Sequence, residues 1–212
     1  MRQALRHLAR KWACKFGHRM CRNAAFQRML VYLDNDELDE IPEHWRYWIL
    51  CDGMKLVNLD IWKRFLNKIM NKTNTEVFLK YLLCTENSSI IEHYLTLIIR
   101  TNYFQKIKQS VGLLCRDVIR KHVKNKDVLL FVLNNIDAIM NRFSHDFPLG
   151  ILLGDIITNV YSFGDLDMII EYAEKYSWIK IELAPSFNSM ITNWRRYLMK
   201  VLSKFQMFHD RV

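Results

Sequence analysis

Apolar residues recur at helical spacing along most of this chain, and that periodicity constrains it to an all-α fold. The pattern is clearest from Ile90 to Ile98, from Ile107 to Val118, from Asp127 to Phe143 and from Ile191 to Phe205. No segment alternates apolar and polar residues between hairpin turns, as a half-buried strand would. Half of the residues are hydrophobic, and only 6 glycines and 3 prolines interrupt them. The sequence therefore predicts a folded helical protein with a sizeable core.

Short polar breaks separate the predicted helices. They lie at 35–42, 71–75, 85–89 and 144–147. The first break ends in Pro42, which is suited to begin a helix, and Asn58 and Asp60 can cap the helix that carries Trp62. About ten helices joined by short loops favour a single domain over residues 1–212. We expect its antiparallel helix pairs to stack into a curved, HEAT-like superhelix.

The formal net charge of +9 at pH 7 is compatible with an acidic partner, an anionic membrane or nucleic acid. The basic residues, however, lie on the polar faces of helices throughout the chain, as solvated surface residues do. We therefore expect no nucleic-acid partner, although a basic helical array that binds nucleic acid is a competing hypothesis. No apolar run reaches the roughly 20 residues of a membrane-spanning helix, and residues 1–20 lack the apolar centre of a secretory signal.

The sequence offers no catalytic or metal-binding constellation. Glu92 and His93 are adjacent, but no second histidine follows at helical spacing, so His93 fits a structural role better than a ligand role. Asp165 and Asp167 lie in a turn, where capping explains them. Phosphate-binding glycine loops and nucleophile elbows are also absent. We therefore expect no catalytic residue, metal ligand or cofactor in this chain.

The five cysteines leave two interpretations open. Cys14 and Cys21 flank Gly17, which suits a tight corner between helices, and Cys115 lies in the middle of a predicted helix. The cysteines lack the tight paired spacing of a zinc site. They could be five buried thiols in a reducing compartment, or two disulfides and one free thiol.

Several short blocks occur in an order and at a spacing that resemble one enzyme family. The blocks are Ala13-Cys14-Lys15-Phe16-Gly17-His18 followed by Cys21 and Phe26; Ile41-Pro42 to Trp45-Arg46 followed by Ile49-Leu50-Cys51-Asp52-Gly53; Trp62; Glu76 through Leu82-Leu83-Cys84-Thr85; and Tyr94-Leu95 followed by Ile98-Ile99-Arg100. Together they resemble the C-terminal helical domain of zinc aminopeptidases of the aminopeptidase N type. The resemblance is clearest between Ala13 and Asn141.

The resemblance implies a non-catalytic role. In such enzymes another domain holds the zinc and removes N-terminal residues from peptides, while the C-terminal helical domain closes over the peptide cavity and often supplies a dimer contact. The expected partners are therefore a catalytic domain, in cis if this chain is a fragment, peptides and a second copy. An independent helical-repeat module that binds a protein or peptide is the alternative hypothesis.

The resemblance also implies particular residue roles. Four positions match family cysteines, which predicts the disulfides Cys14–Cys21 and Cys51–Cys84 and leaves Cys115 free. A fragment of such an enzyme would lie in the secretory pathway or outside the cell, or be membrane-attached through upstream regions. A chain that truly begins at Met1 would be cytoplasmic, with reduced cysteines.

Two further sets of site residues follow from the same resemblance. In a secretory setting, Asn71-Lys72-Thr73 and Asn87-Ser88-Ser89 are candidate glycan acceptors at Asn71 and Asn87. The family commonly has a charged residue after the segment that ends at Arg100, whereas this chain has Thr101-Asn102-Tyr103-Phe104. We therefore expect Tyr103 and Phe104 to contact a partner.

Overall fold

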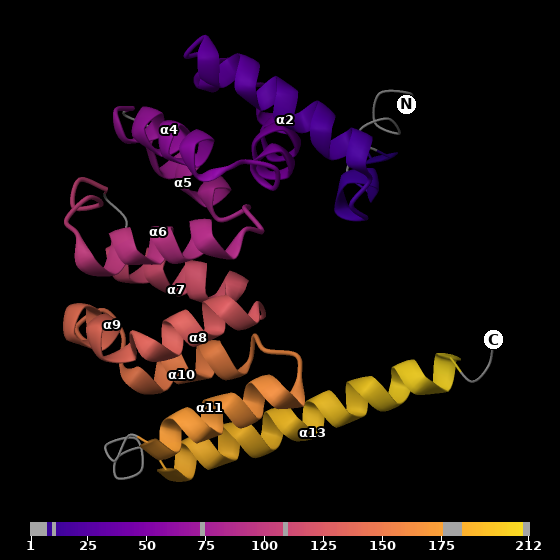
Figure 1. Ribbon diagram of the computed structural model, residues 1–212, viewed down its shortest axis with the longest axis vertical. Coiled ribbons are helices and arrows are strands. Elements are labelled where there is room, and N and C mark those ends of the chain that lie inside the picture. The colour runs from indigo at the N-terminus through magenta and orange to yellow at the C-terminus, as the bar shows by residue number, and fades with distance from the viewer. Residues whose placement is uncertain (1–7, 10–11, 73–74, 108–109, 176–183, 210–212) are drawn as a thin grey trace. The chain divides into compact units, whose positions relative to one another are not determined.

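The computed structural model describes residues 8–9, 12–72, 75–107, 110–175 and 184–209 (Figure 1). Helices are the regular secondary structure of these residues, and no strand occurs among them. The all-α prediction is therefore confirmed. The chain divides into two compact units, residues 1–93 and 94–212, which are described separately below. The curved superhelix and the single domain over residues 1–212 stay predictions.

The first unit is a set of short helices that pack around the segment following Pro42. Its elements are α2 (Arg19–Asp34), the 3₁₀-helix η1 (Leu38–Glu40), α3 (Glu43–Arg46), the π-helix η2 (Tyr47–Asp52), α4 (Leu59–Met70), α5 (Thr75–Leu82) and the first part of α6 (Ser88–Arg100). Helix η2 packs against both α2 and α5, and α4 packs against α5. Asn58 caps α4 as predicted, because its side-chain oxygen accepts a hydrogen bond from the Ile61 backbone N–H at 2.9 Å.

Helix α2 approaches the end of η2 closely at Gly53. A Cβ atom built on Gly53 would lie 3.2 Å from the Ala25 carbonyl oxygen, the Phe26 Cα and the Met29 Cβ. Two of these three atoms belong to the backbone of α2, which cannot rotate away as a side chain can. Glycine therefore allows the two helices to approach at this point, although its backbone is in an ordinary helical conformation.

Replacing Gly53 with alanine is expected to lower the free energy of unfolding by about 1–3 kcal/mol, the usual cost of overpacking. At an open helical position the same replacement stabilises a protein by about 0.5–1 kcal/mol. Gly164, in the first turn of the helix Phe163–Lys175, is the control without a close contact, because a Cβ there would meet nothing nearer than the Ser162 Oγ at 4.0 Å. Its replacement should not destabilise the chain. Urea denaturation of Gly53→Ala and Gly164→Ala measures both effects. Equal changes in the two variants would show that the close helix approach is not formed.

The second unit continues the alternation of helices and short loops. Its elements are the end of α6, α7 (Val111–His122), α8 (Lys126–Asn134), α9 (Ile136–Phe143), α10 (Leu149–Ile157), α11 (Phe163–Lys175) and α13 (Ala184–His209). Helix α7 packs against α8 and α10, and α13 packs against α10 and α11 (Figure 1). Trp194 links α13 to the rest of the unit, because its indole N–H donates a hydrogen bond to the Val160 carbonyl at 2.8 Å.

The apolar stripe from Asp127 to Phe143 predicts one continuous helix, but the structure divides it at Asn135. This residue leaves helical geometry, with φ −116° and ψ 12°, and ends α8. Its side-chain N–H donates to the Phe131 carbonyl at 2.8 Å, and its side-chain oxygen accepts from Arg100 at 2.9 Å. Asparagine competes well for such local hydrogen bonds, which favours a helix end over its continuation. The prediction of one helix was therefore wrong.

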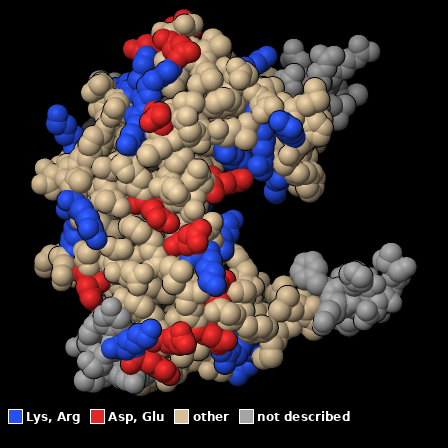
Figure 2. Space-filling view, viewed as in Figure 1, with Lys and Arg blue, Asp and Glu red and all other residues tan. Residues whose placement is uncertain are grey.

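The charged side chains agree with the expectation of solvated faces. Figure 2 shows lysine and arginine interspersed with aspartate and glutamate over the visible face, without one continuous basic area. In the part of the chain that the structure describes, no helix is both long and apolar enough to cross a membrane.

Candidate functional site

Two disulfides cross-link the first unit. Cys14 is bonded to Cys21 and Cys51 to Cys84, with Cα–Cα separations of 5.2 and 5.1 Å. These are the two pairs that the family resemblance implied. Gly17 adopts φ +79° between the first pair, so it makes the predicted corner before α2. Because disulfides persist in oxidising environments, the two bonds indicate a secretory or extracellular compartment.

Cys115 is the free cysteine, and it lies buried in α7. Burial raises the pKa of its thiol to about 12, against the opposing effect of the Arg142 guanidinium. A lone buried thiol of this kind has a structural role rather than a reactive one.

We expect Cys115 to resist alkylation by iodoacetamide in the folded chain at pH 8, because the thiolate that reacts is scarce and enclosed. Unfolding in urea should make the same thiol react fully. The raised pKa also stabilises the folded state below the ordinary thiol pKa, and this contribution should be lost as the pH rises toward 12. Mass spectrometry of labelled chains tests the first expectation. Rapid labelling of the folded chain at pH 8 would contradict it.

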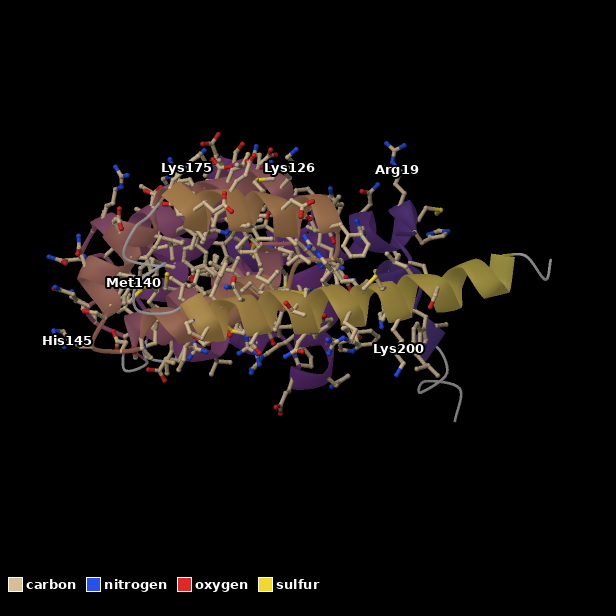
Figure 3. All side chains as sticks on the ribbon, turned by 90° about the horizontal axis from the view of Figure 1, so that it is seen from below. Arg19, Lys126, Met140, His145, Lys175 and Lys200 are labelled. Atoms are coloured by element: carbon tan, nitrogen blue, oxygen red, sulfur yellow. A yellow bond between two sulfur atoms is a disulfide. The ribbon has the colours of Figure 1, made fainter. Side chains whose placement is uncertain are left out.

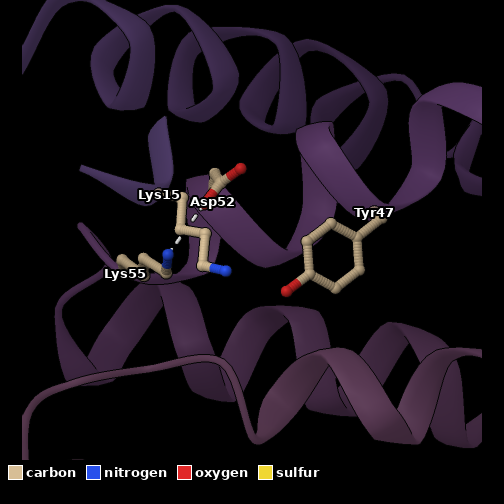
Figure 4. A pocket seen from close by; sticks show the side chains of 4 residues that line it. All are labelled: Lys15, Tyr47, Asp52 and Lys55. Carbon is tan, nitrogen blue, oxygen red and sulfur yellow. Dashed lines mark hydrogen bonds and ion pairs between the residues drawn. The ribbon is translucent and has the colours of Figure 1, made fainter. Parts of the chain in front are cut away.

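An open pocket of about 290 Å³ lies in the first unit and is lined by Lys15, Tyr47, Asp52 and Lys55 (Figure 4). Tyr47 and Asp52 are the two ends of the π-helix η2. π-Helical turns are rare and often occur at functional sites, because they redirect the side chains they carry. In Figure 4 the Lys15 ammonium and the Tyr47 hydroxyl face the same opening.

The charged groups of the pocket belong to a network that spans three segments. Lys55 Nζ lies 2.8 Å from Asp52 Oδ1 and 3.9 Å from Glu86 Oε1. Arg22 of α2 pairs with the same glutamate at 3.2 Å, and its Nε donates to the Cys14 carbonyl. The Asp52 side chain is only 5% exposed, so Lys55 is the cation that compensates its buried charge. The network fixes Lys55 and leaves Lys15 exposed at the mouth of the pocket.

This arrangement suits an anionic group. The Lys15 ammonium and the Tyr47 hydroxyl can both donate hydrogen bonds, while the Lys55 ammonium and the one carboxylate of the lining are already paired with each other. A carboxylate is the anion most common in peptides. Among the residues that the structure describes, no group of three or more His, Cys, Asp or Glu side chains is placed to hold a metal ion.

Sequence reasoning did not identify this pocket. Two of its three charged residues nevertheless follow disulfide cysteines, since Lys15 comes directly after Cys14 and Asp52 directly after Cys51. A charged residue directly after one cysteine of each disulfide was therefore the available signal. This signal could point to one pocket only once the structure showed that both disulfides lie in the first unit.

Tyr103 and Phe104 have different environments. Phe104 is 1% exposed, and its ring lies 5.6 Å from that of Tyr94, so it is part of the core of the second unit. The expectation that Phe104 contacts a partner is therefore wrong, because the side chain is already enclosed by its own unit. Tyr103 is 37% exposed, and partial burial raises the pKa of its phenol. A partner contact at Tyr103 stays a prediction.

The remaining candidate residues lie at the surface or in structural contacts. Asn71 and Asn87 are both exposed, and Asn87 also caps α6 by accepting hydrogen bonds from the backbone N–H groups of Ser89 and Ile90. Thr73, which completes the first triplet, lies outside the described residues. His93 packs edge-on against Trp62, and burial and the nearby Lys63 lower its pKa. Glycosylation at the two asparagines stays a prediction.

Comparison with known proteins agrees with this helical, disulfide-linked architecture. Residues 1–181 match the family model described as the ERAP1-like C-terminal domain. No match was found among the curated proteins with which the sequence was compared. The family match covers most of the 212 residues, and it bears out the resemblance to the C-terminal domain of aminopeptidase N-type enzymes. The chain belongs to the family of ERAP1-like C-terminal domains.

Proposed function

We propose that this chain is a non-catalytic lid and scaffold, which encloses the peptide-binding cavity of a zinc aminopeptidase-like protein. The observation that carries the proposal is the family match over residues 1–181. Its principal partner is then the catalytic domain, which holds the zinc, in cis if this chain is part of a longer protein. We also propose that two copies of the chain contact each other through helices of this domain.

The pocket of the first unit supports a role in holding peptides. Lys15 and Tyr47 present a cation and a hydroxyl at its mouth, and the pairing of Asp52 with Lys55 removes the one repulsive carboxylate. A peptide carboxylate would gain charge-assisted hydrogen bonds there. The pocket would thus orient a peptide by its anionic group while the neighbouring domain acts on the other end.

Fluorescence anisotropy with labelled peptides of about ten residues tests this role, with the peptide ending in either a free carboxylate or an amide. Loss of one charge-assisted hydrogen bond, at about 1.5–3 kcal/mol, should weaken binding of the free carboxylate by at least tenfold in Lys15→Ala. Tyr47→Phe should weaken it less. Lys63→Ala, at an exposed lysine of α4, is the matched control and should leave binding unchanged. Equal binding of the two peptides, or equal losses in the Lys15 and Lys63 variants, would reject the pocket as a peptide contact.

The isolated chain is expected to bind no stoichiometric zinc and to cleave no aminoacyl reporter substrate. A peptidase needs a positioned metal or nucleophile and a base, and the sequence commits no residue to these roles. Metal analysis and reporter assays with and without a chelator measure both properties. One tightly held zinc per chain with chelator-sensitive cleavage would overturn the non-catalytic assignment.

A helical-repeat module that binds a protein or peptide independently is the second candidate function. It is favoured by the same pocket, which lies wholly within the first unit and needs no other domain for its lining. Peptide binding by the isolated chain supports both candidates. The two candidates differ in whether a catalytic domain accompanies the chain. Purifying the native protein and measuring its zinc content and peptidase activity distinguishes them.

A further inference from the structure

The two disulfides of the first unit differ in how accessible their cysteines are. Cys51 and Cys84 are 2% and 5% exposed, so an external thiol meets either of them only after local unfolding. Cys14 is 0% exposed, whereas its partner Cys21 is partly exposed in the first turn of α2. Thiol–disulfide exchange requires access to a sulfur atom. Cys21 is therefore the point at which a thiol can attack the folded unit.

The Cys14–Cys21 bond also anchors the segment that carries Lys15. This corner segment comprises residues 12–20, and Cys14 is the one buried residue in it. The side chains around Lys15 give little support, since Phe16, for example, is 79% exposed. Lys15 is thus held at the mouth of the pocket largely through its neighbour Cys14, which the disulfide joins to α2.

Further contacts between the corner segment and the rest of the unit converge on the same cysteine. The Trp48 indole N–H lies 3.3 Å from Cys14 Sγ, and the Arg22 Nε donates to the Cys14 carbonyl at 3.4 Å. By contrast, Trp12 stacks on Phe16 within the segment itself. Opening the disulfide would therefore loosen the position through which the segment is fixed.

The surroundings of Cys21 favour attack by a thiolate. Lys15 and Arg19 are exposed, and residues 12–20 include no aspartate or glutamate. Figure 3 shows the Arg19 side chain pointing away from the surrounding helices. A thiolate is an anion, so the positive charge of the corner segment raises its local concentration.

The exchange consists of two displacements. A thiolate of a dithiol reductant attacks Cys21 Sγ, the Sγ–Sγ bond breaks, and Cys14 leaves as a thiolate. The Trp48 N–H, 3.3 Å from Cys14 Sγ, can stabilise that thiolate by a charge-assisted hydrogen bond. The second thiolate of the reductant then displaces Cys21 and closes a disulfide within the reductant. Two electrons pass to the protein, and the two cysteine thiolates take up the protons that the dithiol released.

We infer that the Cys14–Cys21 bond is a redox switch for the pocket. A dithiol reductant opens this bond in the folded chain while Cys51–Cys84 stays closed. The released corner segment then no longer presents Lys15 to an anionic group of a peptide. The inference rests on the proposed peptide role of the pocket and adds the regulation of that role.

Reduction of the folded, oxidised chain by dithiothreitol tests the order in which the two bonds open. At successive times the exchange is stopped with acid, free thiols are alkylated with N-ethylmaleimide, and mass spectrometry locates the labels. Cys14 and Cys21 should be labelled at least about tenfold faster than Cys51 and Cys84, because access to the sulfur controls the rate of exchange.

Hydrogen exchange shows whether the corner segment is released. The amides of Phe16, Gly17 and His18 donate backbone hydrogen bonds within it, and they should exchange faster after selective reduction. The amides of α4 should be unchanged, because the Cys51–Cys84 bond stays closed. This measurement uses no peptide, so it tests the switch even if the pocket binds none.

Peptide affinity gives the functional readout. Selective reduction should weaken binding of the free-carboxylate peptide at least about tenfold, as expected for Lys15→Ala, and should cause no further loss in that variant. The double variant Cys14→Ser/Cys21→Ser should bind as weakly as the reduced chain and should not respond to the reductant. The matched double variant Cys51→Ser/Cys84→Ser should keep the response.

Equal rates of reduction for the two disulfides would overturn the inference. So would selective reduction that leaves the affinity of a peptide-binding chain unchanged. An oxidised chain that binds no peptide would reject the peptide role of the pocket. In such a chain, faster hydrogen exchange in the corner segment would still support the release of Lys15, and unchanged exchange would overturn it.

Discussion

Replacing Phe104 with alanine is expected to lower the free energy of unfolding by about 3–5 kcal/mol, the usual cost of removing a buried aromatic ring. The side chain is 1% exposed and lies against Tyr94, which is itself buried in α6. Tyr94 is 1% exposed, and this burial raises the pKa of its phenol far above the usual value. Chemical denaturation monitored by circular dichroism measures the loss.

The neighbouring tyrosine provides the control. Tyr103 is 37% exposed and touches Phe104 edge-on, with the ring centroids 5.3 Å apart. Removing that contact should cost only about 1 kcal/mol, the usual value for one aromatic pair. If Tyr103→Ala destabilised the chain as much as Phe104→Ala, the two residues would share one environment. The distinction between a core side chain and a surface side chain would then fail.

Removing the Cys51–Cys84 disulfide is expected to destabilise the chain by about 3–4 kcal/mol in the chain-entropy model. The bond closes a sequence separation of 33 residues and restricts the unfolded chain accordingly. The Cys14–Cys21 bond closes a separation of only 7, so its loss should cost roughly 2–3 kcal/mol by the same relation. The double variants Cys51→Ala/Cys84→Ala and Cys14→Ala/Cys21→Ala, unfolded in urea without reductant, provide the comparison.

A larger loss from the shorter loop would contradict the entropic explanation. It would indicate that the Cys14–Cys21 bond mainly preserves native contacts. One such contact is known, because the Trp48 indole N–H lies 3.3 Å from Cys14 Sγ. Adding reductant to the unaltered chain breaks both disulfides. The loss in the free energy of unfolding should then equal the sum of the losses measured in the two double variants, because the effects of separate sites add.

The helices themselves could be predicted from the sequence. Periodic apolar residues select a helix because each must reach the same face every three or four positions, and Leu114, Val118 and Leu198 are indeed buried. The cap at Asn58 follows from local chemistry as well, since a side-chain oxygen satisfies a backbone N–H three residues away. The disulfide pairs came from the family resemblance, because spacing left the redox state open.

Tertiary packing decided what local patterns could not express. The apolar stripe continues beyond Asn135, yet the helix ends there, where the asparagine side chain bonds both to the local Phe131 carbonyl and to Arg100 of a distant segment. Phe104 and Tyr103 are adjacent in sequence, yet Phe104 lies against Tyr94 and is 1% exposed, whereas Tyr103 is 37% exposed. The pocket forms because Lys15 and Tyr47, which are 32 positions apart in the sequence, face the same opening. Periodicity fixes which residues share a face of one helix, whereas the neighbours that cover each face are set by contacts between segments far apart in the chain.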